Sequence, residues 1–191
     1  VMKSTDGGST WSSTGLNWEA SQGRRISRLL ISPSNSNTLI AATSIGIYKT
    51  TNAGSSWTLT TSGFFRDLEF KPGTPSTMYA TGRGSNSSHQ VFRSTNTGDS
   101  WSQVTNLSGV NRIAIGVSAA SSGFVAAVAS SSNTNGFAGF YASSNSGESF
   151  SLRFSSQNLL GWELDGSDSR GQGWYDLAIS VSPTNADIIH V

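Results

Sequence analysis

The densest group of side chains that could bind a ligand lies between Ser155 and Asp176, near the C-terminal end of the sequence. Exposed indole rings can stack on sugar rings, and carboxylate oxygens are the ligands that calcium prefers. Asp165 and Asp168 could therefore contribute to a calcium site, although their spacing is not that of an EF-hand loop. The sequence predicts a ligand-binding loop formed by Trp162, Glu163, Asp165, Asp168, Arg170, Trp174, Tyr175 and Asp176.

Two plainer interpretations of this segment stay open. The polar residues could form a solvated loop that holds no metal, and Trp162 and Trp174 could pack between structural units instead of contacting sugar. His89 and His190 lie far apart in the sequence and have no metal-binding neighbours. Apart from the calcium hypothesis, no cofactor is therefore expected.

A second set of polar side chains occurs four times in one shared pattern. Each copy reads Ser/Thr, any residue, Asp/Asn, any residue, Gly, any residue, Ser/Thr and an aromatic residue, and we call these copies turn motifs. They span Ser4–Trp11, Thr50–Trp57, Ser94–Trp101 and Ser143–Phe150. Asp or Asn can accept hydrogen bonds from nearby backbone N–H groups, Gly can adopt a positive φ, and the aromatic ring can anchor the next strand. The predicted turn-forming residues are Asp6, Gly8, Trp11, Asn52, Gly54, Trp57, Asn96, Gly98, Trp101, Asn145, Gly147 and Phe150.

The turn motifs recur with a near-constant period, because their Asp/Asn positions are 46, 44 and 49 residues apart. Alternating apolar strands joined by a polar turn lie between them, at Arg28–Thr43, Asp67–Gly82, Ala114–Ala129 and Leu177–Val191. A further strand leads into each motif and another leaves it. One period therefore holds four antiparallel strands in about 45 residues, which is the size of a β-propeller blade.

The predicted fold is an all-β propeller of four-stranded antiparallel blades, and residues 1–191 hold about four of them. Closed rings usually have roughly six to eight blades, so we expect a partial propeller from a larger ring, with no complete domain boundary in the sequence. Trp18, Phe64 and Phe65 lie between a fourth strand and the next first strand, where we expect them to pack between neighbouring blades.

The composition excludes several classes of protein. Only 12% of the residues are charged and the net charge is +1, so no basic surface for nucleic acid is expected. No apolar stretch is long enough to span a membrane. The absence of cysteine excludes disulfides and fits a large bacterial exoprotein stabilised by its core. The N-terminal residues lack the apolar segment of a signal peptide, so any export signal is expected outside this sequence.

The turn motifs resemble the Asp-box repeats of sialidases, xyloglucanase-type glycoside hydrolases, sortilin-like receptors and photosystem assembly propellers. The resemblance covers nearly the whole chain and implies the propeller fold, with the Asp-boxes on the blade periphery, away from the ligand-binding face. Because this fold hosts many activities, the resemblance carries little information about function.

A narrower resemblance involves Gly171–Val191. The segment is similar to one found in very large exoproteins of Bacteroidetes, which carry a C-terminal sorting domain for the type IX secretion system. The matching residues are Gly171, Gln172, Gly173, Trp174, Tyr175, Asp176, Leu177 and the turn Ser182–Asn185. This resemblance implies a secreted or cell-surface protein whose sorting domain lies outside the sequence.

The resemblance to xyloglucanase-type enzymes implies a test for catalysis. In those enzymes one catalytic aspartate lies in a segment resembling Arg-Thr-Asp-Val-Gly-Gly, and the matching positions here are Asn52 and Asn96. Asparagine cannot transfer a proton, so neither residue can act as a general acid or base. Asp6 keeps a carboxylate, but its motif is predicted to be a plain turn.

The sialidase resemblance implies arginines that converge on a carboxylate, yet the Phe/Tyr-Arg-Ile-Pro signature of that family is absent. Four arginines do lie near the starts of predicted first strands. We expect them to line a central channel or to pair with Asp67 and Asp176; they are Arg25, Arg28, Arg66 and Arg112.

We therefore predict a non-catalytic, extracellular propeller segment of a large secreted or cell-surface bacterial protein, with a scaffold, adhesion or glycan-binding role. Its expected partners are glycans or surface proteins, and the outer-membrane secretion machinery during export. One alternative is a xyloglucanase-like glycoside hydrolase whose catalytic carboxylates lie partly outside this fragment. Another is a receptor or assembly-factor propeller that binds a peptide or protein. No catalytic residue or metal ligand is assigned.

Overall fold

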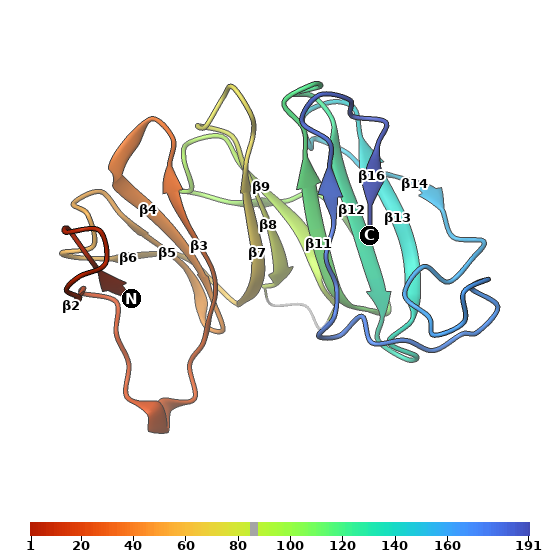
Figure 1. The fold of residues 1–191 in the computed structure, drawn as a ribbon, viewed down its shortest axis with the longest axis horizontal. Helices are drawn as coiled ribbons and strands as arrows, with labels where there is room; N and C mark the ends of the chain where they lie inside the picture. The colour runs from red at the N-terminus through yellow and green to blue at the C-terminus, as the bar shows by residue number, and fades with distance from the viewer. Residues whose placement is uncertain (85–87) are drawn as a thin grey trace.

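A computed structural model describes residues 1–84 and 88–191, and nearly all its regular elements are β-strands (Figure 1). Within these residues, three four-stranded antiparallel sheets follow one another, and we call them blades A, B and C. Blade A contains β3 (Ile26–Ser32), β4 (Asn35–Thr43), β5 (Gly46–Thr50) and β6 (Thr58–Ser62). Blade B contains β7 (Phe64–Phe70), β8 (Met78–Arg83), β9 (Gln90–Ser94) and β10 (Ser102–Gln103). Blade C contains β11 (Val110–Val117), β12 (Val125–Ser131), β13 (Phe137–Ser143) and β14 (Ser151–Phe154).

A two-stranded sheet lies at each end of this series. β1 (Met2–Lys3) and β2 (Ser12–Ser13) flank the first turn motif and so correspond to the third and fourth strands of a blade. The short 3-10 helix η1 (Ala20–Gln22) follows them. β15 (Ser180–Val181) and β16 (Ile189–His190) correspond to first and second strands. The predicted four-stranded antiparallel blades are thereby confirmed.

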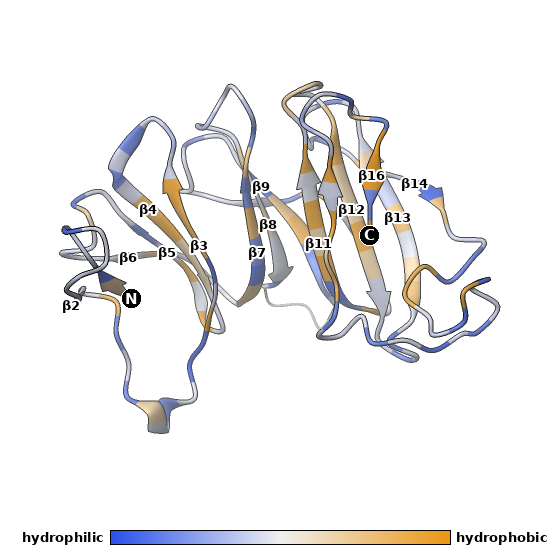
Figure 2. Ribbon diagram, viewed as in Figure 1, coloured by the Kyte–Doolittle hydropathy of each residue, from blue (hydrophilic) through white to orange (hydrophobic). Residues whose placement is uncertain are grey.

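In blades B and C the second strand is the most buried, because it pairs with a strand on either side and packs against a neighbouring blade on either face. In β12 the first six residues are buried, and its apolar part consists of small alanines and valines. Figure 2 shows the corresponding concentration of hydrophobic residues in the strands and of hydrophilic residues in the connections. A strand buried on both faces reads as a continuous apolar run.

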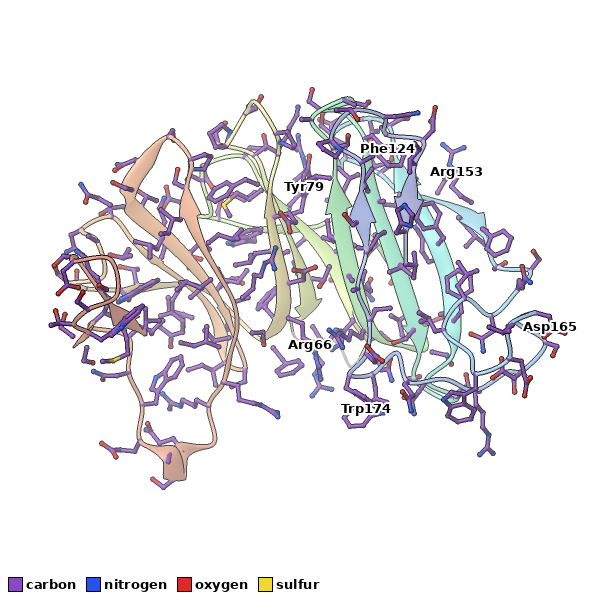
Figure 3. All side chains as sticks on the ribbon, viewed as in Figure 1. Arg66, Tyr79, Phe124, Arg153, Asp165 and Trp174 are labelled. Atoms are coloured by element: carbon purple, nitrogen blue, oxygen red, sulfur yellow. The ribbon has the colours of Figure 1, made fainter. Side chains whose placement is uncertain are left out.

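The hydrophobic cores lie between blades. One core joins Ile40 and Ile47 of blade A to Phe65, Leu68 and other residues of blade B. A second joins Tyr79 of blade B to Ile113, Val125 and other residues of blade C, and Figure 3 shows Tyr79 between the two sheets. A blade therefore cannot bury its apolar faces alone and depends on its neighbours.

The first strands of successive blades contact one another, with β7 touching both β3 and β11, and β11 touching β15. Near the start of each first strand in blades A, B and C, the pairing register shifts by one residue, as in a β-bulge. The unpaired residues are Ser27, Arg66 and Asn111. No helix in the described part of the chain is long and apolar enough to cross a membrane.

Candidate functional site

The up-and-down order of the strands gives each blade two ends with different connections. The turn motifs join third strands to fourth strands at one end, which we call the turn-motif face. The connections from second to third strands, and from each blade to the next, lie at the other end. We call this end the arginine face, because it carries Arg24, Arg25, Arg66, Arg83 and Arg112.

Each turn motif closes around the side-chain oxygen of its Asp or Asn. In the second motif, Asn52 Oδ1 accepts hydrogen bonds from the Ser56 backbone N–H at 2.9 Å and from Thr50 Oγ1 at 2.8 Å. Asp6, Asn96 and Asn145 accept the equivalent pair of hydrogen bonds in the other three motifs. These side chains are engaged in closing their own turns.

Asp6 is the carboxylate among these four positions. Hydrogen bonds from Thr10 and Ser4 lower the pKa of Asp6 to about 2. It is therefore ionised at neutral pH, and a group with so low a pKa has no proton to donate as a general acid.

The glycines of the turn motifs have φ values of +93°, +89°, +81° and +75° at Gly8, Gly54, Gly98 and Gly147. They also allow close approach to the preceding part of the chain. A Cβ built on Gly147 would lie 2.4 Å from the ring of Tyr79 in blade B, and one on Gly54 would lie 3.0 Å from Thr14. The turn motifs thus pack against the preceding structural unit.

Ion pairs between successive blades accompany this packing, and they are not among the features predicted from the sequence. Lys49 in blade A pairs with Asp99 in the turn motif of blade B, with an N–O distance of 2.7 Å. Arg93 in blade B pairs with Glu148 in the motif of blade C at 3.4 Å, and its Nε donates to the Ser146 carbonyl. The sequence does contain a pattern for these ion pairs: a basic residue lies directly before one turn motif, and an acidic residue lies directly after the glycine of the next.

A pocket of about 510 Å³ opens on the arginine face beside blades A, B and C. Its lining contains four arginines and no carboxylate among the described residues; it consists of Gln22, Gly23, Arg24, Arg25, Ser44, Ile45, Phe64, Arg66, Arg83, His89 and Asn111. Phe64 is a partly buried ring that Arg66 and Arg83 approach at 4.9 and 5.5 Å from its centroid. We call this the arginine pocket.

The electrostatics of the arginine pocket follow from burial and from like charges. Burial lowers the pKa of Arg66, and the charges of Arg112, Arg25 and Arg83 lower it further. Burial also lowers the pKa of His89 to about 4, with Arg66, Arg83 and Arg112 adding to the shift. His89 is therefore neutral at physiological pH, and the positive charge of the pocket resides on its arginines.

A second hollow, of about 240 Å³, lies along the first strands and is lined by three of the arginines predicted for a central channel, namely Arg28, Arg66 and Arg112. Arg28 contacts Glu69 at 2.6 Å and Asp67 at 3.8 Å, as predicted for the Asp67 pair. Asp67 Oδ2 also accepts a hydrogen bond from the Ile115 backbone N–H across the blade boundary. Burial raises the pKa of both carboxyl groups, against the opposing effect of Arg28.

Among the described residues, the other predicted channel arginines do not form ion pairs like that of Arg28. Arg66 Nη1 donates to the Trp174 carbonyl at 3.3 Å, and Arg112 Nη2 donates to the Leu177 carbonyl at 3.2 Å. Arg112 also lies within electrostatic reach of Asp67 and Asp176. Arg25 lines the arginine pocket. The channel prediction therefore describes Arg28 and Arg112, Arg66 lines both hollows, and Arg25 lines the arginine pocket.

The segment 155–176 is organised by Asn158, which is not among the predicted ligand-binding residues. Its Oδ1 accepts hydrogen bonds from the backbone of Phe137 and Leu160, and its Nδ2 donates to the carbonyls of Asp168 and Arg170. Asp168 Oδ2 accepts a hydrogen bond from the Trp162 backbone N–H. The side chain of Asp168 thus helps to close the loop.

The candidate residues of this segment separate into two groups. Trp174 and Tyr175 form an edge-to-face pair with centroids 4.4 Å apart, and they are 51% and 49% exposed. Figure 3 shows Trp174 near Arg66 at the lower end of the blades, whereas Asp165 lies at the far tip of the segment. Trp162 is also exposed, but no described contact joins it, Glu163, Asp165 or Arg170 to the arginine pocket.

The position of the Trp174–Tyr175 pair follows from a tight turn. The backbone N–H groups of Tyr175 and Asp176 both donate to the Gln172 carbonyl. Gly173 N–H donates to the Asn135 carbonyl, and a Cβ on Gly173 would lie 2.5 Å from Ser130. The turn is therefore held against the β12–β13 connection, and the two aromatic rings project from it.

In the part of the chain that the structure describes, no group of three or more His, Asp or Glu side chains is positioned to hold a metal ion. The calcium hypothesis for Asp165 and Asp168 stays a prediction. The Asp165 carboxylate accepts a hydrogen bond from the Ser167 backbone N–H, and hydrogen bonds from Ser167 lower its pKa.

Comparison with known proteins establishes the fold. No protein-family model and no curated protein matches the sequence. Among solved structures, an ancestral GH74 enzyme has a TM-score of 0.66 and 24% identity over 82% of this chain and 21% of that chain. The GH74 enzyme of Niastella koreensis has a TM-score of 0.69 and 22% identity over 97% of this chain and 30% of that chain. The GH74 xyloglucanase of Xanthomonas campestris has a TM-score of 0.61 and 11% identity over 86% of this chain and 26% of that chain.

The fold is that of a β-propeller. The predicted fold class is thereby confirmed. The chain spans 21% to 30% of the length of these enzymes. At identities below 25% the likeness concerns the arrangement of the strands, so the propeller is the property shared with them.

Proposed function

We propose that this chain is a non-catalytic part of an extracellular bacterial β-propeller that binds glycans at its arginine face. The turn motifs are, on this proposal, Asp-boxes that brace the blades. The protein is secreted or displayed on the cell surface as cargo of a type IX secretion system, where it has an adhesive role.

The observation that carries the proposal is the exposed Trp174–Tyr175 pair beside the arginine pocket. Sugar recognition combines an exposed aromatic ring, which packs on the apolar face of a pyranose, with hydrogen-bond donors that contact its oxygens. Trp174 and Tyr175 offer the rings, and Arg66, whose Nη1 donates to the Trp174 carbonyl at 3.3 Å, offers guanidinium donors beside them. The glycan class of one structural neighbour, a xyloglucanase, is consistent with such a ligand.

A glycan array tests this function directly. The purified chain is applied to plant, bacterial and host glycans, alongside the Trp174→Ala and Tyr175→Ala variants. We expect the loss of either ring to weaken binding by about tenfold, the value of burying part of an aromatic side chain. Trp162→Ala is the matched control, because Trp162 is 62% exposed on the same segment but away from the pocket. Binding that is equally sensitive to Trp162→Ala, or no binding at all, would contradict the proposal.

The localisation has its own test. When the full-length protein is expressed in a bacterium with a functioning type IX system, it should reach the medium or the cell surface. Retention in the cytosol under those conditions would contradict the secreted assignment and leave the glycan test unaffected.

A glycoside hydrolase is the second candidate, and Asp67 and Glu69 are the observation that favours it. They lie in the hollow along the first strands, and burial raises the pKa of both carboxyl groups, as a general acid requires. Both also contact Arg28, however, and Asp67 ties β7 to β11. Release of reducing ends from xyloglucan by the chain, abolished in Glu69→Gln, would favour the hydrolase over the binding protein.

A further inference from the structure

The arginine pocket carries positive charge that its described surroundings do not neutralise. Arg24, Arg25, Arg66 and Arg83 line it without any carboxylate in the described lining. The ion pairs of the described residues involve other basic side chains, namely Arg28, Lys49 and Arg93. Like charges held close together are unfavourable unless an anion joins them.

Two buried polar atoms in the lining have no hydrogen-bond partner among the described residues. They are Nε of Arg66 and Nδ1 of His89. His89 is only 3% exposed, so water does not readily replace a missing partner. Leaving a buried donor such as Nε of Arg66 unpaired is unfavourable, because the donor has lost its hydrogen bonds to water. A ligand with acceptor oxygens would recover part of that cost.

Aromatic rings hold the arginines in place before any ligand arrives. The guanidinium of Arg24 lies 5.8 Å from the ring centroid of Trp18, and those of Arg66 and Arg83 lie 4.9 and 5.5 Å from the ring centroid of Phe64. Phe64 itself packs edge-on against His89, with centroids 5.7 Å apart. Stacking of this kind reduces the conformational freedom that binding would otherwise remove.

We propose that the arginine pocket binds the carboxylate or sulfate group of an acidic polysaccharide, while Trp174 and Tyr175 contact the adjoining sugar. The polysaccharide part of this inference rests on the proposed function, whereas the anion part rests on the pocket alone. Guanidinium groups suit both anions, because their planar N–H pairs match two oxygens of a carboxylate or sulfate.

The test compares oligosaccharides of matched length by isothermal titration calorimetry. One consists of galacturonate residues, one of sulfated galactose and one is a neutral xyloglucan fragment; inorganic sulfate is the fourth probe. We expect the charged oligosaccharides to bind at least about tenfold more tightly than the neutral one, and to weaken in 0.5 M NaCl because salt screens the arginines. The tighter of the two charged oligosaccharides identifies the anion.

Two variants and a control assign the effect to the pocket. Arg83→Gln and Arg66→Gln should each weaken the charged oligosaccharides by about tenfold or more, as expected for losing a charged hydrogen bond. Arg83 is exposed, so its variant should fold even if Arg66→Gln does not. Arg153 is the control, since Figure 3 shows it at β14, away from Arg66.

The outcomes are distinct. Equal affinity for charged and neutral oligosaccharides, or equal effects of Arg83→Gln and Arg153→Gln, would overturn the anion pocket and leave glycan binding standing. If inorganic sulfate binds in an Arg83-dependent manner but no oligosaccharide does, the anion pocket is supported and the glycan function is contradicted.

Discussion

The two ends of the blades differ in how their polar groups are used. At the turn-motif face the Asp or Asn oxygen, the Ser or Thr hydroxyl and the glycine N–H bond to one another in every copy, and charged neighbours pair across blades. At the arginine face, guanidinium groups gather without a described carboxylate, and buried Arg66 and His89 atoms have no described partner. The polar groups of the turn-motif face stabilise the structure, whereas those of the arginine face keep hydrogen-bonding atoms that a ligand could use.

The largest effect should come from crowding the turn-motif face. In Gly147→Ala the new methyl would lie 2.4 Å from Tyr79, at a φ of +75°. We expect a loss of about 3 kcal/mol in the free energy of unfolding, from backbone strain and overpacking together. Gly73→Ala is the matched control, because its φ is +74° and nothing lies within 4 Å of the added methyl. It should lose about 1 kcal/mol in urea denaturation, and equal losses would show that blade contact is unimportant.

At the arginine face, we expect a pH effect centred on His89. Its folded pKa of about 4 lies below the ordinary 6.5, so between those values the unfolded chain binds a proton that the folded chain does not. Neutral His89 therefore contributes to the free energy of unfolding. This contribution is fully present above pH 6.5 and is lost as the pH falls through about 4, for a total of roughly 3 kcal/mol.

Stability measured from pH 7 to pH 4 tests this expectation. His89→Leu should remove much of the slope, whereas His190→Leu, at an exposed position, should keep it. An unchanged profile in His89→Leu would show that His89 titrates alike in the folded and unfolded chains.

Single substitutions at the two faces should differ in their effect on the free energy of unfolding, by less than the changes above. Asn96→Ala removes the acceptor for Ser94 Oγ and the Ser100 N–H, so we expect a loss of about 1–2 kcal/mol in thermal or urea unfolding. Asn96→Asp should lose far less, because Asp6 fills the same role in the first motif. Arg83→Gln, at the other face, should leave stability within about 0.5 kcal/mol. A larger loss there would assign Arg83 a structural role.

The smallest effect concerns the pairs between blades. A double-mutant cycle of Lys49→Gln and Asp99→Asn should give a coupling energy of about 0.5 kcal/mol, because Asp99 is largely exposed. The coupling should decline in 0.5 M salt. A coupling that salt does not change would mean that the pair acts through packing and not through charge.

The sequence predicted the scaffold well because its constraints are local. Strand alternation and the turn chemistry of Asn52, Asn96 and Asn145 are properties of short segments. The strands Gly46–Thr50 and Gln90–Ser94 lead into their turn motifs, as predicted. The pair between Lys49 and Asp99 was missed although its signal is present, since the two residues lie in different repeats.

The candidate site could be predicted only in part. Trp174 is predictable from its aromatic ring in a non-repeated segment, and the structure places this ring on the surface. The arginine pocket was not predicted, because Arg24, Arg83 and His89 come from separate connections with no shared pattern. The central role of Asn158 also depends on a backbone path that no local signal specifies.

The bulges at the start of the first strands have a consequence for how such proteins diversify. Ser27, Arg66 and Asn111 stand outside the strand pairing and line the two hollows, whereas Leu68 and Ile113, two residues further on, remain in the core. The extra residue faces a hollow and has no partner in the strand pairing. Its side chain can therefore change while the residues that follow it in the strand keep their alternation between the two faces of the sheet. Three neighbouring blades already display a hydroxyl, a guanidinium and a carboxamide there, so mutation can sample new ligand chemistry while the ring stays intact.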